Sequence, residues 1–187
     1  MATERDERRS VYVEKTRHEL EELAQRGVRM GGNAFSSILL AKGDLTADEL
    51  AGAEPFSGRD GVALRKSLER LGYGPEEWCW ALLGQGGEAP GLSLDSELVR
   101  LTLTALDPAT LVLCDEVAAS AVRNAYADDL VELQDLEEAM LAPGYVVRIR
   151  GVRVLNLGGF EAALDDSRQK QVMWARLKEI PALGEPF

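Results

Sequence analysis

The sequence predicts an α/β fold in which helices cover both faces of one sheet. Apolar, strand-like runs alternate along the chain with amphipathic helical segments, and this alternation is typical of a parallel sheet. The 187 residues are enough to bury one complete core, and no internal repeat or low-complexity segment interrupts them. We therefore expect a single domain over residues 1–187, a three-layer α/β/α sandwich with a four-stranded, mostly parallel sheet.

The first part of the chain predicts a helix, a strand and a loop. Residues 1–30 form a helical lead-in, since VYVEKTRHELEELAQRG places Leu20 and Leu23 at helical spacing before Gly27. The glycine-rich connector GVRMGGNA leads to the short β-prone run FSSILLA. Thr46 is an N-cap signal for a single turn of helix. The loop PFSGRDG then precedes an amphipathic helix.

The rest of the chain continues the alternation of helices and strands. The segment DLVELQDLEEAMLAPG remains ambiguous between helix and loop, and residues 181–187 form a C-terminal tail. The remaining predicted elements are the helix GVALRKSLERLGY, the strand EEWCWALL, the helix SELVRLTLTALD capped by Asp95 or Ser96, the strand ATLVLCD, the helix EVAASAVRNAYA, two strands in YVVRIRGVRVLNL joined at Gly151, and the long helix FEAALDDSRQKQVMWARLKEI.

The loops that follow the strands are the expected position of a ligand site. In open α/β sheets, ligands bind outside the carboxyl ends of the parallel strands. The loops at residues 43–44, 85–91, 115–116 and 157–160 should therefore gather at one edge of the sheet, together with the PFSGRDG loop.

Composition excludes several classes of protein. The sequence contains no run of about 18 apolar residues, so we expect no membrane helix. The charged start MATERDERRS is unlike a secretory signal. Cys79 and Cys114 lie in apolar runs, so we expect both to be buried thiols of a cytoplasmic protein. The alternative is a disulfide between them. With His18 as the single histidine, the usual zinc ligands are too few, and we expect neither a metal nor a cofactor.

The net charge of −11 argues against DNA as a partner, because binding to phosphates requires basic groups. Arg148 and Arg150 alternate along a strand and could form a local basic patch, but an exposed, solvated strand edge is the simpler interpretation.

From about Gly31 to Ile180, the order of these elements resembles the uracil-DNA glycosylase superfamily, most closely its bacterial branch with an iron–sulfur cluster. PFSGRDG is similar to the family's RPFVGRAG, LDPATLVLCDEVAASAV to its later strand and helix, and RGVRVLNLGGFEAAL to its final motif. The resemblance implies a glycosylase-like fold. It also implies that Phe56 stacks a flat ring, with Gly58 shaping the loop, although a core phenylalanine under a glycine turn would show the same pattern.

Departures from the family pattern concern its catalytic groups. Asp44, in KGDLTADE, is the one acidic residue left where the family activates a water. Ala81 stands where the family reads uracil with an asparagine, and losing such a reader costs about 1–3 kcal/mol of base discrimination. Phe160 stands where the family has a histidine donor, whose loss costs about 100- to 1000-fold in rate. Gln85 aligns with a cluster cysteine, so no iron–sulfur cluster is expected.

Acidic residues near the expected site have alternative interpretations. Glu88 lies in a GEAPG motif after the second strand instead of the first, so it is either a relocated acid/base group or part of a chance turn. Asp115 and Glu116, with Asp44, Glu88 and Glu161, could form an acidic rim that holds Mg²⁺ or a cationic ligand, or they could be helix N-terminal charges. The list of candidate residues is thus Asp44, Phe56, Gly58, Ala81, Glu88 and Phe160.

Three functions are compatible with this pattern. The resemblance with its departures favours a pseudoenzyme that lacks uracil excision and binds a base, a nucleotide or a protein. The second is a divergent DNA-repair glycosylase, in which Asp44 orients water and Phe56 stacks a flipped base. The third is an interaction domain whose acidic surface contacts a basic partner. Whether the chain is an enzyme stays open at this point.

Overall fold

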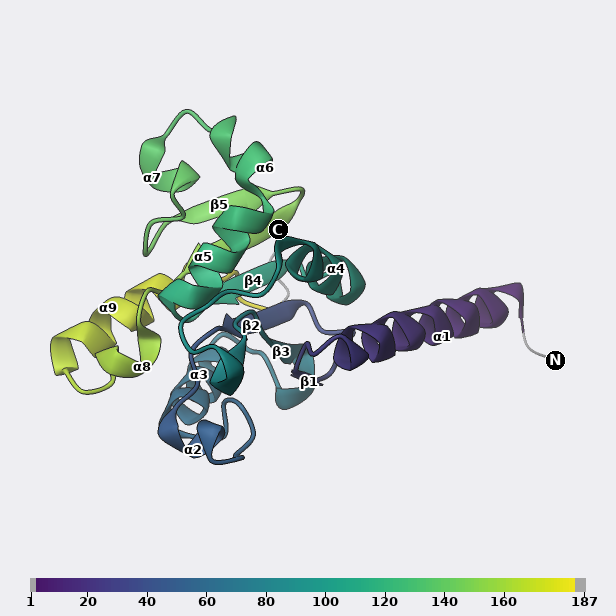
Figure 1. The fold of residues 1–187 in the computed structure, drawn as a ribbon, viewed down its shortest axis with the longest axis horizontal. Helices are drawn as coiled ribbons and strands as arrows, with labels where there is room; N and C mark the ends of the chain where they lie inside the picture. Colours follow the sequence, from purple (N-terminus) through teal and green to yellow (C-terminus); the bar gives the residue numbers. More distant parts are fainter. Residues whose placement is uncertain (1–2, 184–187) are drawn as a thin grey trace.

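The sheet contains six strands in the described part of the chain, residues 3–183, of the computed structural model. They lie in the order β1-β3-β2-β4-β6-β5 (Figure 1). The strands are β1 (Met30–Gly32), β2 (Ile38–Lys42), β3 (Trp78–Leu82), β4 (Thr110–Leu113), β5 (Val146–Ile149) and β6 (Val152–Asn156).

The α/β class is confirmed, while the predicted total of four strands is wrong. The neighbours β3, β2, β4 and β6 run parallel to one another, but an antiparallel strand is added at each edge. At one edge, β1 arises from the glycine-rich connector, where Gly31 lies opposite Trp80. At the other edge, β5 pairs with β6 through the tight turn at Arg150 and Gly151, so the sheet is mixed.

Helices connect the strands and cover the sheet (Figure 1). The helix at the start of the chain, α1, projects away from the body, whereas α6 and α7 lie beyond β5. The α-helices are α1 (Glu4–Gln25), α2 (Ala47–Leu50), α3 (Arg59–Arg70), α4 (Ser96–Leu106), α5 (Glu116–Ala125), α6 (Ala127–Val131), α7 (Leu136–Ala139), α8 (Phe160–Ala163) and α9 (Ser167–Leu177); η1 (Pro75–Glu77) and η2 (Gly86–Glu88) are 3₁₀ turns.

Two hydrophobic clusters pack against opposite faces of the sheet because strand side chains alternate between the faces. Leu39 and Ala41 of β2 belong to the cluster that includes α4 and α5. Ile38 and Leu40 belong to the cluster formed with α3, α8 and α9. Lys42 is two residues beyond Leu40, so its side chain points to the same face as α3.

Three local features differ from, or refine, the expected elements. The predicted helix over residues 160–180 is interrupted, because Asp166 accepts a hydrogen bond from the backbone N–H of Gln169 and starts α9 afresh. Asp95, and not Ser96, caps α4. The ambiguous segment contains the short helices α6 and α7. Of the predicted lead-in and tail, residues 1–2 and 184–187 lie outside the described part of the chain. None of the described helices is both long and apolar enough to cross a membrane.

Candidate functional site

A small cavity lies at the carboxyl edge of the sheet, between the ends of β2 and β4. The connection from β2 leads to β3 on one side, and the connection from β4 leads to β5 and then β6 on the other. This reversal of strand order creates a crevice, which is the usual ligand position in open α/β sheets. The cavity has a volume of about 200 Å³, and its lining is Lys42, Asp44, Leu45, Asp60, Cys114, Asp115, Gly159, Phe160, Glu161 and Ala162.

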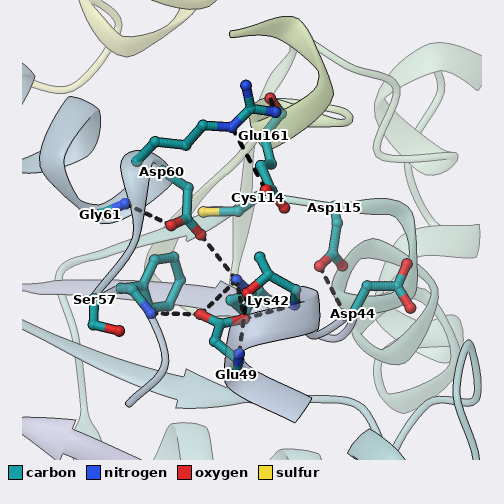
Figure 2. Close-up of polar contacts among 12 residues, drawn as sticks. Lys42, Asp44, Glu49, Ser57, Asp60, Gly61, Cys114, Asp115 and Glu161 are labelled. Carbon is teal, nitrogen blue, oxygen red and sulfur yellow. Dashed lines mark hydrogen bonds and ion pairs between the residues drawn. The ribbon is translucent and has the colours of Figure 1, made fainter. Parts of the chain in front are cut away.

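A buried lysine and two buried carboxylates form a polar cluster at the end of β2, next to the cavity. Lys42 Nζ lies 2.8 Å from Asp60 Oδ2, and 2.9 and 2.8 Å from the two carboxylate oxygens of Glu49. Figure 2 shows the two carboxylates on opposite sides of the ammonium. All three residues are at most 4% exposed. Each partner is therefore needed, since an unpaired buried charge is costly.

The electrostatics of Lys42 follow from two opposing effects. Burial by itself lowers the pKa of the Lys42 ammonium, but hydrogen bonds and charge attraction from Asp60 and Glu49 outweigh it, so the pKa is raised above its ordinary value of 10.5. Lys42 is thus a protonated structural cation at neutral pH. It is not a base or a nucleophile, because either role requires the neutral amine.

The same carboxylates fix the loop that contains Phe56. Glu49 also accepts hydrogen bonds from the backbone N–H groups of Phe56 and Thr46, each at 2.8 Å. Asp60 accepts one from Gly61 N–H at 2.8 Å. Helix α2, the Phe56 loop and the start of α3 are therefore all tied to one polar cluster around Lys42.

Phe56 has an unusual backbone conformation in this loop. Its φ angle is 61°, in the left-handed region that bulky residues avoid. Gly61 makes this turn possible, because a Cβ atom at this position would lie 1.7 Å from the carbonyl oxygen of Phe56. Such strain costs about 1–3 kcal/mol and persists where surrounding contacts enforce it. The hydrogen bond to Glu49 is one such contact.

The Phe56 ring faces the protein interior. It is 3% exposed, its centroid lies 5.0 Å from Lys42 Nζ, and its ring packs against Trp80 at a centroid distance of 6.5 Å. The ring does not border the cavity at the strand ends. In this arrangement Phe56 supports the buried ammonium, and a ligand in the cavity has no access to its face.

Asp115 connects the ends of β2 and β4. Its carboxylate accepts hydrogen bonds from the backbone N–H groups of Gly43 and Asp44 and from Ala118 N–H, which makes it the N-cap of α5. Desolvation raises the pKa of this carboxyl above its ordinary value of 3.8, and the three backbone donors oppose that shift. Asp115 thus serves as a cap and a loop anchor, in agreement with the helix N-terminal interpretation.

Asp44 is the exposed carboxylate of the cavity. It lies two residues after the end of β2 and borders the cavity, while its backbone N–H donates a hydrogen bond to Asp115 (Figure 2). No hydrogen bond or ion pair joins its side chain to another described residue. Asp44 is therefore free to accept a hydrogen bond from a ligand or a water.

The outer wall of the cavity comes from α8. Phe160 is 3% exposed, and its backbone N–H donates to the carbonyl of Cys114 at 2.9 Å. Glu161 lies 3.7 Å from the guanidinium of Arg59, which also pairs with Asp165. These ion pairs join the first residue of α3 to α8 and the turn that follows it, and hydrogen bonding to Asp165 is the main reason that the pKa of Arg59 is raised.

The remaining predicted site residues lie away from the cavity. Ala81 is completely buried in the core cluster on the α4–α5 face. Glu88 is exposed in the turn η2, and Gly58 is the exposed N-cap of α3. Glu116 pairs with Arg123 on the surface. Of the six candidates, the structure brings only Asp44 and Phe160 to the cavity.

The two cysteines are separate buried thiols. Cys79 belongs to the core cluster on one face of the sheet and Cys114 to the cluster on the other, and neither is part of a disulfide. Burial raises the pKa of Cys79 and raises that of Cys114 well above its ordinary value of 9.0, so Cys114 is a poor nucleophile although it borders the cavity.

The site combines carboxylates with few other polar groups. Among the described residues, no group of three or more His, Cys, Asp or Glu side chains is arranged to hold a metal ion. No protein-family model matches the chain, and a search of curated proteins finds no similar sequence.

Lys42, Glu49 and Arg59 were not among the candidates from the sequence, although they organise the site. One signal was present: Lys42 directly follows the apolar run ILLA at the carboxyl end of a strand, where a charged side chain must find a partner. The spacing of the carboxylates did not reveal that partner, because it depends on the path of the Phe56 loop.

Proposed function

We propose that the protein is a divergent member of the uracil-DNA glycosylase superfamily that lacks uracil excision and acts as a binding module for a small, base-like ring. The observation that carries the proposal is the cavity at the strand ends. Its described lining contains four carboxylates and one ammonium, but neither an imidazole nor a side-chain amide. Without a side-chain amide, the cavity cannot pair with both edges of a pyrimidine, and without an imidazole it lacks the donor that stabilises the departing base anion.

The charge of the cavity selects the kind of ligand. The lining carries Asp44, Asp60, Asp115 and Glu161 against Lys42, whose charge Glu49 and Asp60 already neutralise. Such a site disfavours a phosphate and favours a neutral or cationic ring with amino or protonated nitrogen donors. The volume of about 200 Å³ is below the range of about 300–1,000 Å³ usual for larger ligands, so a single ring fits better than a nucleotide.

A titration with a graded set of ligands tests this proposal. We expect 2-aminopyridine, which offers ring and amino donors, to bind more tightly than uracil, and uridine monophosphate not to bind at all. Asp44→Asn should weaken the binding of 2-aminopyridine at least fivefold, whereas the control Asp48→Asn, an exposed carboxylate of α2, should leave it unchanged. Tighter binding of the monophosphate, or equal binding by both variants, would contradict the proposal.

The position of Asp44 also supports a second candidate, the divergent base-excision glycosylase. An exposed carboxylate at the mouth of the cavity is suited to orient a water toward a base. The buried Phe56 ring counts against this function, since a flipped base would need that ring as its stacking surface. An assay for the excision of bases from labelled oligonucleotides separates the two candidates.

A further inference from the structure

A second concave surface lies between α3 and the α8–α9 pair, on the side of the molecule rather than at the strand ends. This groove has a volume of about 440 Å³. Its apolar floor includes Phe160, Met173 and Trp174. Its charged lining residues are all basic among the residues that the structure describes: Arg59, Lys66, Arg70 and Lys170.

Most of this positive charge is not neutralised. Arg59 pairs with Asp165 and Glu161, whereas Lys66, Arg70 and Lys170 make no ion pair with any described residue, although Lys170 is close enough to Asp165 to help lower the pKa of that carboxyl. Arg70 instead lies over the ring of Trp174, at 5.6 Å from its centroid. In a chain with a net charge of −11, three cations that form no ion pair and surround an apolar floor favour an anionic, partly apolar occupant.

The chain itself contains a segment with the opposite properties. Residues 127–141 contain six acidic residues and no basic one: Asp128, Asp129, Glu132, Asp135, Glu137 and Glu138. Of these, Asp129 pairs with Arg150, and Asp135 caps α7. The other four make no ion pair within residues 3–183.

This acidic segment also exposes large apolar side chains. Val131 is 74% exposed, Leu136 is 73% exposed and Met140 is 53% exposed. The segment forms α6 and α7, which project beyond β5 at one end of the molecule (Figure 1). Apolar side chains that are this exposed and lie within one short segment are typical of an interaction surface.

We propose that the α6–α7 segment of one copy docks in the basic groove of a second copy. Carboxylates of the segment would face Lys66, Arg70 and Lys170, while its apolar side chains would cover the groove floor. The groove is lined by α3, α8 and α9, whereas the segment forms α6 and α7, so the proposed contact joins two copies. A contact between two different surfaces is heterologous, and it generates rings or open chains unless two copies engage each other reciprocally.

A second copy fits the groove better than a nucleic acid does. The phosphate backbone offers no apolar side chains for the floor, and the net charge of −11 repels a polyanion at long range. The α6–α7 segment supplies both the carboxylates and the apolar groups, since residues 127–141 contain six acidic residues and no basic one.

Sedimentation velocity over a range of protein and salt concentrations tests this contact. We expect the average mass to exceed that of the monomer at high protein concentration and low salt, and to fall as salt is added. Lys66→Glu/Lys170→Glu in the groove, and separately Glu132→Lys/Glu137→Lys in the segment, should each weaken self-association at least tenfold. The control Arg65→Glu/Arg168→Glu, which changes exposed cations of the same helices outside the groove lining, should not.

A mixture of the two reversed variants makes the test independent of folding defects. The groove variant keeps its acidic segment and the segment variant keeps its basic groove, so together they should form a 1:1 complex although each alone is monomeric. A wild-type protein that stays monomeric under all conditions, or self-association that the reversals leave unchanged, would overturn the proposal. Binding of an oligonucleotide in the groove without self-association would also overturn it.

Discussion

Lys42 Nζ lies 2.8 Å from Asp60 Oδ2, although 18 residues separate the two in the sequence and both side chains are almost fully buried. This ion pair joins the end of β2 to the first turn of α3. Together with Glu49 it determines the path of the loop between them, and thereby the inner wall of the cavity.

Replacing the buried lysine should expose the dependence of the fold on this cluster. Lys42→Met leaves Glu49 and Asp60 buried without their cation, and breaking a buried pair in this way costs about 3–5 kcal/mol. Urea unfolding followed by tryptophan fluorescence measures the loss. The matched surface change Lys66→Met should stay within about 0.5 kcal/mol of the wild type. Equal unfolding free energies for the two variants would show that the cluster contributes little.

The pH dependence of stability should reveal Asp115. Because desolvation raises the pKa of this carboxyl in the folded state above 3.8, the folded protein binds the proton more tightly than the unfolded chain does. Stability relative to Asp115→Asn should therefore increase as the pH falls through the folded-state pKa toward 3.8, and level off below it. Urea unfolding of both proteins between pH 3 and pH 7 checks the sign; a difference that shrinks on acidification would contradict it.

The turn at Phe56 should depend on Gly61 and not on Gly58, although both lie in the same loop. Gly61→Ala places a Cβ atom 1.7 Å from the Phe56 carbonyl oxygen, so the loop must move, at a cost of about 1–3 kcal/mol. Gly58→Ser introduces a favourable N-cap residue at a φ of −85°, with its nearest contact at 3.4 Å, and should be neutral or slightly stabilising. Thermal unfolding of both variants compares them; similar losses would mean that the close approach is not the cause.

Both thiols should be protected in the folded protein. Cys79 and Cys114 are buried, with raised pKa values, so a thiol reagent at pH 8 should modify neither at an appreciable rate, and both should react after denaturation. The number of thiols that react is measured from the absorbance of the chromophore that the reagent releases. Rapid reaction of Cys114 in the native state would mean that the cavity gives solvent access to its sulfur.

Most helices and the central strands could be predicted because their signals are local. Apolar runs such as ILLA and periodic leucines such as Leu64 and Leu68 determine which face each element buries. The edge strand β1 could not be predicted from the sequence, because glycine is unfavourable in strands. It exists because Trp80 spreads over Gly31, where a Cβ atom would lie 2.5 Å from the indole.

The site was less predictable than the fold. Asp44 and Phe160 border the cavity because both lie in the short segments that follow β2 and β6, and a sequence pattern locates such strand ends well. Phe56 is in the predicted loop, but its left-handed backbone turns the ring inward toward Lys42. That orientation depends on contacts with Glu49 and Gly61 that are tertiary, so no spacing in the sequence indicates it.

We propose that this carboxylate-lined cavity does not excise bases, and a glycosylase assay tests this most directly. Labelled oligonucleotides that contain uracil, hypoxanthine or xanthine are incubated with the protein at low salt, and abasic sites are cleaved and counted. We predict no abasic product above the rate without protein, and no retention of the DNA. Excision of any of these bases that Asp44→Asn abolishes would contradict the account and establish the protein as an active glycosylase.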